Sequence, residues 1–312
     1  MGQAPLAALN LLLTQDPLVT QDLSVPELFT AVEPLDERNV HFQGKVRQVN
    51  SQPTSPDSNA TPAEAISATK EALPTEASGS LLAFVTGGSR GLGYEVAKAL
   101  RQNGHRVVII SKDPERAAAA AQTLDCDFRA VDVADIETFR ASLSEAVATF
   151  GIPQILVLAH GVMSEKMSKT LRTTDAEWRR VMATNLDSVF TAVSEVGSKM
   201  AEARNGRIVI FSACLGRMSG PGNAGGLAPY RISKAGVNAL VRNLAHETGH
   251  GSRGLLVDAI CPNHSRTDMG GPDAPRSAEE GAETAIWLAL REFTPGVDQT
   301  GLFWEDRQVI PW

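Results

Sequence analysis

Hydrophobic and polar positions along the chain change in pattern near residue 80. From Leu81 onward, short apolar runs alternate with longer segments in which apolar residues recur at helical spacing. Such alternation predicts an α/β fold of the Rossmann type: a doubly wound, seven-stranded parallel sheet with helices on both faces. The expected strands are Leu82–Thr86, Arg106–Ile110, Phe128–Val131, Ile155–Leu158, Arg207–Phe211, Leu255–Ile260 and Gly301–Trp304. The expected helices include Gly93–Asn103, Ile136–Phe150, Asp175–Met200, Pro229–Thr248 and Ser277–Leu290.

The first 80 residues lack this alternation. Residues 51–80 consist mainly of Ser, Thr, Pro, Ala and Glu and cannot bury enough apolar surface to offset the entropy of ordering, so they are interpreted as a flexible linker. Residues 1–50 are more apolar, but none of their periodic segments is long enough to form an independent hydrophobic core. We expect residues 1–50 to be an N-terminal extension that is partly ordered at most. The alternative is that they form a segment that docks onto a protein partner. Residues 81–312 are the expected nucleotide-binding domain.

Charge and cysteine content argue against nucleic-acid binding, disulfide bonds and a metal site. The formal net charge is −7, most of it before residue 80, so nothing indicates nucleic-acid binding, which needs a basic face. The three cysteines are widely spaced and match no metal-ligand pattern, which favours a reducing compartment without disulfides or a metal site. No early segment has the length or flanking charges of a membrane anchor or signal peptide. A cytoplasmic location is the default expectation.

A glycine-rich turn follows the first expected strand and opens the first expected helix. Glycines let the backbone approach a ligand closely, and the N–H groups at a helix start favour an anion, so this position predicts a dinucleotide pyrophosphate site. A glycine cluster alone would indicate only a turn, but its place in a complete series of strands and helices favours nucleotide binding. The turn reads Thr86-Gly87-Gly88-Ser89-Arg90-Gly91-Leu92-Gly93.

The end of the second expected strand indicates which nicotinamide cofactor is used. Dinucleotide folds that take NAD usually place an acid there, whereas this chain has Ser111 and Lys112. Without a carboxylate to repel a 2′-phosphate, and with Arg90 and Lys112 able to pair with it, we expect NADPH/NADP+ as the cofactor. Asp132 and Val133, just after the third strand, are placed to meet the adenine ring.

A tyrosine and a lysine four residues apart begin the segment Pro229–Thr248. This spacing puts the Tyr230 hydroxyl and the Lys234 ammonium on one helix face. The pKa of a phenol is roughly 10, which is too high for efficient proton transfer at neutral pH. A nearby cation and an oxidised nicotinamide would each lower this pKa. The pair is therefore a candidate catalytic site.

Together these motifs resemble the short-chain dehydrogenase/reductase family. The resemblance rests on TGGSRGLG at 86–93, on Asn185 within MATNLDSVF and on YRISK at 230–234, and it extends from Leu81 to Trp312. PYRISKAGVNAL at 229–240, RTDMGG at 266–271 and the ending GLFWEDRQVIPW are similar to the carbonyl-reductase-like branch. That branch implies reduction of a ketone, aldehyde or quinone with NADPH.

The resemblance also implies roles for individual residues. Tyr230 would be the general acid, Lys234 its cation and ribose anchor, and Asn185 the holder of a proton-relay water. The cofactor would further contact Ala159, Gly161, Pro262 and Thr267, the last at the nicotinamide carboxamide or a phosphate.

Three departures from the family pattern surround this site. Leu158-Ala159-His160-Gly161 replaces Asn-Asn-Ala-Gly, so side chains that usually tie the sheet together are expected to be lost, and His160 is expected to be structural rather than catalytic. Ala213 stands where the family has a serine that hydrogen-bonds the substrate carbonyl. Ser212 could replace it only if the strand slips by one residue, and Cys214 and Ser219 are other candidate donors. Pro262-Asn263-His264 replaces Pro-Gly, a change that Asn263 can tolerate by adopting a left-handed backbone.

Three readings follow from these observations. The leading one is an NADPH-dependent oxidoreductase that acts on a small molecule with a carbonyl or related unsaturated group, taking hydride from nicotinamide and a proton from Tyr230. A nucleotide-binding scaffold or sensor is the second, favoured by Ala213. The third is an enzyme that catalyses a cyclisation or isomerisation without redox turnover. The substrate and the oligomeric state stay open.

Overall fold

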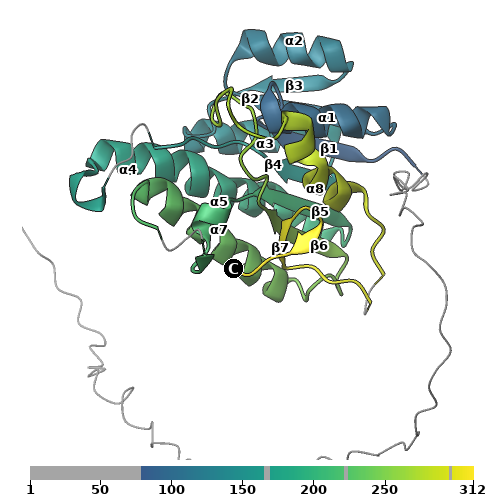
Figure 1. Cartoon of the computed structure of the whole chain (residues 1–312). Helices are drawn as coiled ribbons and strands as arrows, with labels where there is room; N and C mark the ends of the chain where they lie inside the picture. Colours follow the sequence, from purple (N-terminus) through teal and green to yellow (C-terminus); the bar gives the residue numbers. More distant parts are fainter. Residues whose placement is uncertain (1–78, 165–168, 221–223, 295–296) are drawn as a thin grey trace, which may run out of the picture. The chain divides into compact units, whose positions relative to one another are not determined.

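The computed structural model of the chain describes residues 79–164, 169–220, 224–294 and 297–312 (Figure 1). The expected N-terminal extension and nearly all of the expected linker lie outside the described residues, so both remain predictions. From Leu82 onward, the described residues form one sheet between two layers of helices.

The sheet has eight strands in the order β3-β2-β1-β4-β5-β6-β7-β8. Neighbouring strands from β3 to β7 run parallel. The order reverses between β1 and β4, and ligands of open α/β sheets bind at the carboxyl ends of the strands beside such a switch point. The strands are β1 (Leu82–Thr86), β2 (Arg106–Ser111), β3 (Asp127–Ala130), β4 (Ile155–Leu158), β5 (Gly206–Phe211), β6 (Leu255–Ile260), β7 (Phe303–Glu305) and β8 (Gln308–Val309).

The expectation of seven parallel strands is confirmed, and β8 is an addition to it. This strand pairs antiparallel with β7 through a two-residue turn at Asp306 and Arg307, whose φ angles are 53° and 59°. Positive φ at both central residues is typical of tight hairpins. The strand is short, exposed and half polar, so the hydrophobic pattern could not reveal it.

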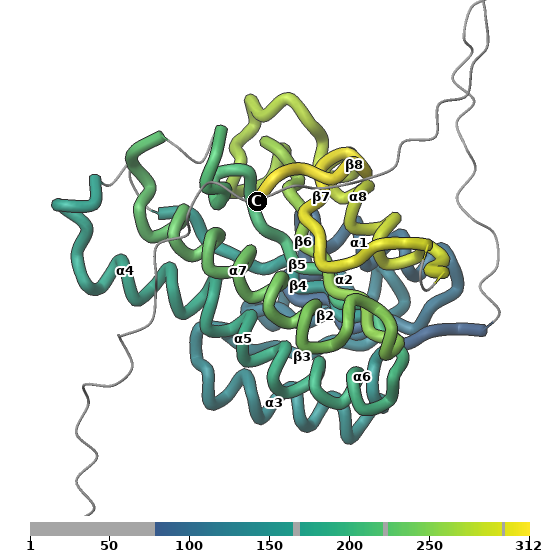
Figure 2. Tube along the Cα trace, turned by 90° about the horizontal axis from the view of Figure 1, so that it is seen from below, coloured from purple at the N-terminus to yellow at the C-terminus, as the bar shows by residue number. Residues whose placement is uncertain are grey.

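Alternation along the strands divides the core between the two faces of the sheet. In β1, Leu82 and Phe84 belong to one buried cluster, whereas Ala83 and Val85 belong to the other. Helices α3 (Ile136–Phe150), α5 (Ser188–Ala192) and α7 (Ala228–Glu247) cover the first face. Helices α1 (Gly91–Gln102), α2 (Pro114–Leu124) and α8 (Ala278–Leu290) cover the second (Figure 2). Both faces are buried, as a parallel sheet requires.

Helix α2 was not among the expected helices. Its start has a clear signal, because the Asp113 side chain accepts a hydrogen bond from Arg116 N and Pro114 occupies the first turn. A run of five alanines weakens the hydrophobic contrast between its faces, which is why periodicity missed it.

The single long helix expected over Asp175–Met200 is a succession of α4 (Asp175–Met182), α5 and α6 (Ser198–Glu202) joined by two π-helical segments. The first π segment, Ala183–Asp187, carries Asn185. Such wide turns inside α-helices are frequent at functional sites. Among the helices of the described residues, none combines the length and apolar character needed to cross a membrane.

Candidate active site

The glycine turn after β1 is held close to the start of α1. Gly87 and Gly91 have φ angles of +68° and +57°, which favour glycine. A Cβ atom on Gly93 would lie 2.5 Å from the Gly87 carbonyl oxygen, so any larger residue there would push the helix away from the turn. The glycines therefore allow the helix start to lie directly against the turn.

Helix α1 begins without a side-chain cap at Arg90. By contrast, the Asp113 and Asp135 side chains cap α2 and α3 by accepting hydrogen bonds from backbone N–H groups. The first N–H groups of a helix need an acceptor, and the positive end of the helix dipole favours an anion. An uncapped helix behind a glycine turn fits the pyrophosphate of a dinucleotide.

The two cations expected to meet a 2′-phosphate both have acidic partners. Lys112 Nζ lies 2.7 Å from Asp132 Oδ2, and Arg90 forms an ion pair with Asp268. Burial raises the pKa of Asp132, but hydrogen bonds from Lys112 and the Ala134 N–H outweigh burial and hold this pKa below its usual range. Both cations remain largely exposed, so a phosphate can reach them in exchange for these carboxylates.

Other expected cofactor residues are gathered around the turn. Ser89 Oγ and Ser111 Oγ lie 2.6 Å apart and link the turn to the end of β2. A Cβ atom on Gly91 would lie 3.1 Å from Thr267 Cγ2, so Thr267 is beside the glycine turn, as a phosphate or nicotinamide contact requires. The Val133 side chain is buried in the core, which leaves only its backbone for the adenine.

His160 is a half-buried link between β1 and α5. Its Nδ1 lies 2.6 Å from Thr86 Oγ1, and its Nε2 lies 2.6 Å from Ser188 Oγ. Ser188 donates its own proton to Thr184 O, so it accepts from Nε2–H and leaves Nδ1 to accept from Thr86. Burial, followed by the Lys234 charge, lowers the pKa of His160 to about 3, and the ring is neutral. The asparagine side chains of the family pattern are absent here, and the imidazole links β1 to α5 in their place.

Tyr230, Lys234 and Asn185 come together at the carboxyl end of the central strands. Lys234 Nζ donates to Phe211 O at 2.7 Å and lies 5.9 Å from the centre of the Tyr230 ring. Asn185 Oδ1 accepts a hydrogen bond from Val162 N at 2.8 Å, and Asn185 Nδ2 donates to Val162 O at 2.9 Å. These two bonds fix the position of the segment after β4. A Cβ atom on Gly161 would lie 3.4 Å from Asn185 Oδ1 and 3.7 Å from Lys234 Nζ, so these groups share one small space.

Burial dominates the titration of the catalytic pair. It raises the pKa of Tyr230 above its usual range, and the Cys261 and Cys214 thiols raise it further. Burial also lowers the pKa of Lys234 to about 8. Lys234 by itself therefore does not make Tyr230 acidic, and the phenol keeps its proton at neutral pH. Within the described part of the chain, the Tyr230 hydroxyl has no hydrogen-bond partner, so its proton is available to a substrate.

Ala213 lies against Tyr230 in a small apolar cluster. The cluster also contains Val181, with the partly buried Val162, Met163, Leu215 and Leu227 packed around it. Ser212 does not replace the missing hydroxyl, because β5 keeps its register and Ser212 Oγ lies 2.5 Å from Asn238 Oδ1. The wall beside Tyr230 is therefore apolar.

Two other candidate donors, Cys214 and Ser219, and the Pro262-Asn263-His264 segment also lie within the described residues. The Cys214 N–H donates to Cys261 Sγ at 3.2 Å, and a hydrogen bond from Cys261 lowers the pKa of the Cys214 thiol. No hydrogen bond is found for Ser219 among the residues that the structure covers, and its role remains a prediction. Asn263 has φ +57°, so it adopts the left-handed backbone that the change from glycine requires. Pro262 O accepts from Ser265 Oγ at 2.9 Å.

Sequence reasoning missed several residues that support this site. Ser233 accepts from Asn185 Nδ2 at 3.1 Å, and Asn238 holds Ser212. Ser188 binds His160 on the side opposite Thr86, which was expected only as part of the glycine turn. Ser233 lies inside the YRISK motif, but its contact joins residues 48 positions apart, and only the fold brings them together.

The chain matches the short chain dehydrogenase family over residues 81–277. It is 32% identical over 193 residues to the 3-oxoacyl-[acyl-carrier-protein] reductase FabG of Chlamydia trachomatis serovar D, covering 60% of this chain and 75% of that protein. The FabG protein of Escherichia coli K12 is 33% identical over 190 residues, with the same coverage.

Two solved structures are also similar. One is described as ribose-5-phosphate isomerase from Brucella melitensis 16M, with a TM-score of 0.61 and 27% identity over 67% of this chain and 85% of that one. A short chain dehydrogenase/reductase family protein has a TM-score of 0.59 and 26% identity over 67% of this chain and 89% of that one. Sequence match, sheet order and site geometry agree: the chain belongs to the short-chain dehydrogenase family of oxidoreductases.

Proposed function

We propose that the protein is an NADPH-dependent reductase of ketones that carry an apolar chain. The observation that carries this proposal is the buried Tyr230, protonated and unpartnered in the described residues, which lies beside Lys234 at the same edge of the sheet as the uncapped start of α1. A protonated phenol suits reduction, because the carbonyl oxygen must gain a proton as the carbon gains hydride.

Arg90 and Lys112 support the choice of NADPH over NADH. Both are exposed cations at the turn and at the end of β2, where a 2′-phosphate would be bound. Their carboxylate partners Asp132 and Asp268 are also exposed or half-exposed, and surface ion pairs of this kind contribute little stability. A phosphate dianion therefore competes with them at small cost.

The apolar wall supports the substrate class. Val162, Met163, Leu215 and Leu227 surround Tyr230, and Ala213 adds no hydroxyl. A substrate with an acyl chain next to its keto group would bury that chain here. The FabG relatives are named for 3-oxoacyl groups, which have this character. A small ketone of the carbonyl-reductase-like kind is the alternative substrate.

In this proposal, NADPH supplies the hydride when it is bound. Tyr230 donates its phenolic proton to the carbonyl oxygen, and the Lys234 cation stabilises the phenolate that results. Asn185 fixes the segment after β4 through both of its bonds to Val162. The apolar wall excludes water from the reacting carbonyl.

The test follows NADPH oxidation by absorbance with the full chain, using a 3-oxoacyl thioester and a panel of small ketones and quinones. We expect consumption with the thioester that falls by at least about a hundredfold in Tyr230→Phe, because general-acid catalysis contributes that much, while NADPH affinity stays unchanged. Tyr94→Phe, on α1, is the matched control and keeps full activity.

Wild-type rates in Tyr230→Phe would refute the mechanism. NADPH binding without consumption of any substrate would instead favour a nucleotide-binding scaffold, the second candidate, which the missing hydroxyl at Ala213 supports. Product formation without NADPH consumption would identify a non-redox enzyme.

A further inference from the structure

A pocket of about 440 Å³ lies at the amino ends of β5 and β6. These are the ends of the strands opposite to Phe211, whose carbonyl oxygen binds Lys234, so the pocket is not part of the candidate active site. Its volume is within the range of small-molecule sites. It is lined by residues 204–207, residues 251–254, Leu256 and Phe293.

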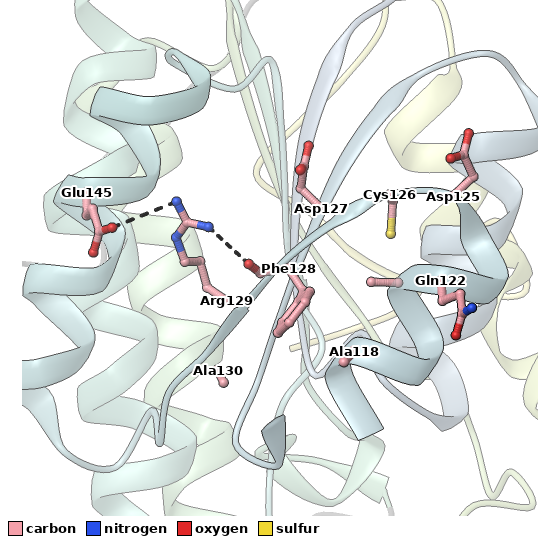
Figure 3. A pocket seen from close by; sticks show the side chains of 10 residues that line it. Ala118, Gln122, Asp125, Cys126, Asp127, Phe128, Arg129, Ala130 and Glu145 are labelled. Carbon is pink, nitrogen blue, oxygen red and sulfur yellow. Dashed lines mark hydrogen bonds and ion pairs between the residues drawn. The ribbon is translucent and has the colours of Figure 1, made fainter. Parts of the chain in front are cut away.

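Three arginines line this pocket and no acidic residue does. Arg204 and Arg253 are exposed, and Arg207 is half-buried. In the part of the chain that the structure describes, no carboxylate lies within ion-pair distance of these guanidinium groups. A second pocket, beside β3, differs in this respect, because its Arg129 lies 3.9 Å from Glu145 (Figure 3). The pocket at β5 and β6 therefore has an unbalanced positive charge.

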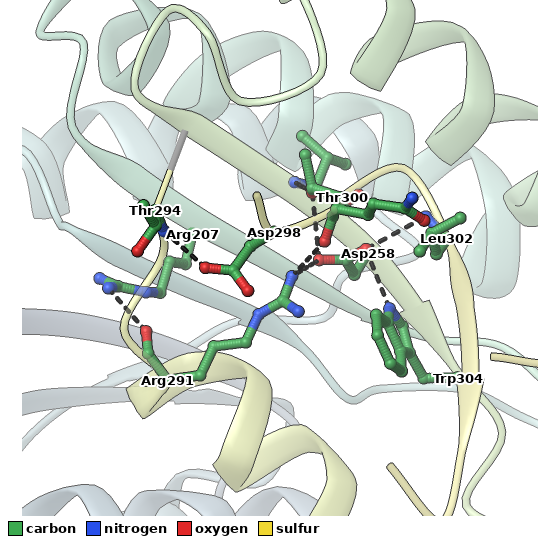
Figure 4. Close-up of polar contacts among 10 residues, drawn as sticks. Arg207, Asp258, Arg291, Thr294, Asp298, Thr300, Leu302 and Trp304 are labelled. Carbon is green, nitrogen blue, oxygen red and sulfur yellow. Dashed lines mark hydrogen bonds and ion pairs between the residues drawn. The ribbon is translucent and has the colours of Figure 1, made fainter. Parts of the chain in front are cut away.

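The Arg207 side chain has one donor that is hydrogen-bonded and one buried donor that has no acceptor among the described residues. Its Nη2 donates to Arg291 O at 2.9 Å, but its Nε is buried and has no acceptor among the described residues (Figure 4). The neighbouring Arg291 is neutralised by Asp258 at 3.0 Å, so no acid is left over for Arg207. Burial and the Arg291 charge both lower the pKa of Arg207. An anion in the pocket would balance the charge of the Arg207 guanidinium, which lines the pocket and has no carboxylate partner among the described residues.

The two loops that carry the arginines are locked together. Arg204 and Gly254 have φ angles of +53° and +79°, and Gly206 N donates to Gly254 O at 3.0 Å. A Cβ atom on Gly254 would lie 1.9 Å from Arg204 O, so only glycine allows this contact. The pocket is therefore preorganised, and a ligand would lose little free energy in ordering it.

The remaining wall is apolar. Leu256 is buried and Phe293 is half-buried. Gly251 packs against Phe293, because a Cβ atom there would lie 2.6 Å from Phe293 Cζ. An apolar wall next to three guanidinium groups matches a ligand with an anionic end and an organic body.

We propose that this pocket binds a small organic phosphate, with the phosphate held by Arg204, Arg207 and Arg253 and the organic part against Phe293 and Leu256. A phosphate dianion balances more than one guanidinium and accepts their paired N–H groups. The site is separate from the cofactor turn and from Tyr230, and it does not depend on the reductase proposal.

Isothermal titration calorimetry of the full chain tests this site, with phenyl phosphate and inorganic phosphate as probes at constant ionic strength and with NADPH present in excess. We expect phenyl phosphate to bind about tenfold more tightly than inorganic phosphate, because only the former contacts the apolar wall. Arg253→Gln and Arg204→Gln should each weaken phenyl phosphate about tenfold, since each removes charged hydrogen bonds.

The controls separate this site from general charge effects and from the cofactor turn. Arg116→Gln, at an exposed position on α2, should bind as the wild type does. Arg204 and Arg253 are exposed, so their variants keep the fold, and Arg207→Gln can be added if it remains folded. Affinities that are equal in the wild type, Arg204→Gln and Arg253→Gln, or no binding in the wild type, would overturn the proposal. A failed reductase assay would leave these results unaffected.

Discussion

At the scale of the residue, His160 and Ala213 show that departures from a family pattern can have opposite structural consequences. His160 keeps a link across the fold, because its two ring nitrogens bind Thr86 and Ser188. Ala213 removes a hydroxyl, and neither its neighbour Ser212 nor a shift of β5 restores one. The first change conserves hydrogen bonding, whereas the second changes the chemistry of the substrate wall.

Introducing the hydroxyl at Ala213 should therefore raise the rate of ketone reduction. In Ala213→Ser, we expect kcat for a small ketone to increase by about a hundredfold, because a positioned donor to the carbonyl oxygen contributes that much. Steady-state NADPH oxidation measures the effect, with Ala213→Gly as the control for packing. An unchanged kcat would show that another group, such as Ser219 or the substrate itself, already supplies the donor.

At the scale of the element, the turn between β1 and α1 combines tight backbone geometry with exposed charge. Gly87, Gly91 and Gly93 bring the helix start against the strand, and α1 has no side-chain cap. Arg90 and Lys112 lie at the edge of this turn, each beside a carboxylate. The backbone of the turn has no contact that would select one dinucleotide, so we expect discrimination between the two cofactors to depend on these two side chains.

Replacing both cations should narrow the preference for NADPH. In the double variant Arg90→Ala with Lys112→Ala, we expect the ratio of NADPH to NADH affinity to fall by about a hundredfold, roughly tenfold for each charged hydrogen bond lost. Fluorescence titration of both cofactors measures the ratio. Lys98→Ala, a change at a half-exposed position on α1 away from the turn, is the control. A ratio equal to that of the wild type would refute the placement of the 2′-phosphate.

At the scale of the whole molecule, one buried carboxylate joins the C-terminal segments of the domain to strand β6. Asp258 in β6 is bound by Arg291 at the end of α8, by Thr300, by the Leu302 N–H and by Trp304 Nε1 in β7 (Figure 4). Burial raises the pKa of Asp258, and these donors act in the opposite direction. The network holds the last strands and α8 on the core.

Removing this carboxylate should destabilise the domain strongly. In Asp258→Asn, we expect the free energy of unfolding to fall by about 3–5 kcal/mol, because the Arg291 charge is left buried without its partner. Urea unfolding followed by circular dichroism measures the change. Asp125→Asn breaks an exposed ion pair with Arg101 and should cost less than about 1 kcal/mol. Equal losses in the two variants would show that the buried network has no special role.

Much of the fold could be predicted from local patterns. Seven strands, the glycine turn and the helix expected over Pro229–Thr248, which is α7, have strong periodic or motif signals, because each buries a face or requires glycine. Helix α2 and strand β8 were not predicted, because a run of alanines and a two-residue strand show little contrast between hydrophobic and polar positions. Thr267 beside Gly91 was anticipated from the family resemblance alone, as no local pattern connects residues so far apart.

The sequence by itself determined the order of strands and helices and the residue types at the cofactor turn and the catalytic helix, because those depend on local periodicity and on backbone freedom. Only the tertiary structure decided what surrounds them. Burial raises the pKa of Tyr230 and lowers the pKa of His160, and carboxylates from other loops meet Arg90 and Lys112. Desolvation and long-range pairing arise when distant segments pack together, so their effects are set by the fold.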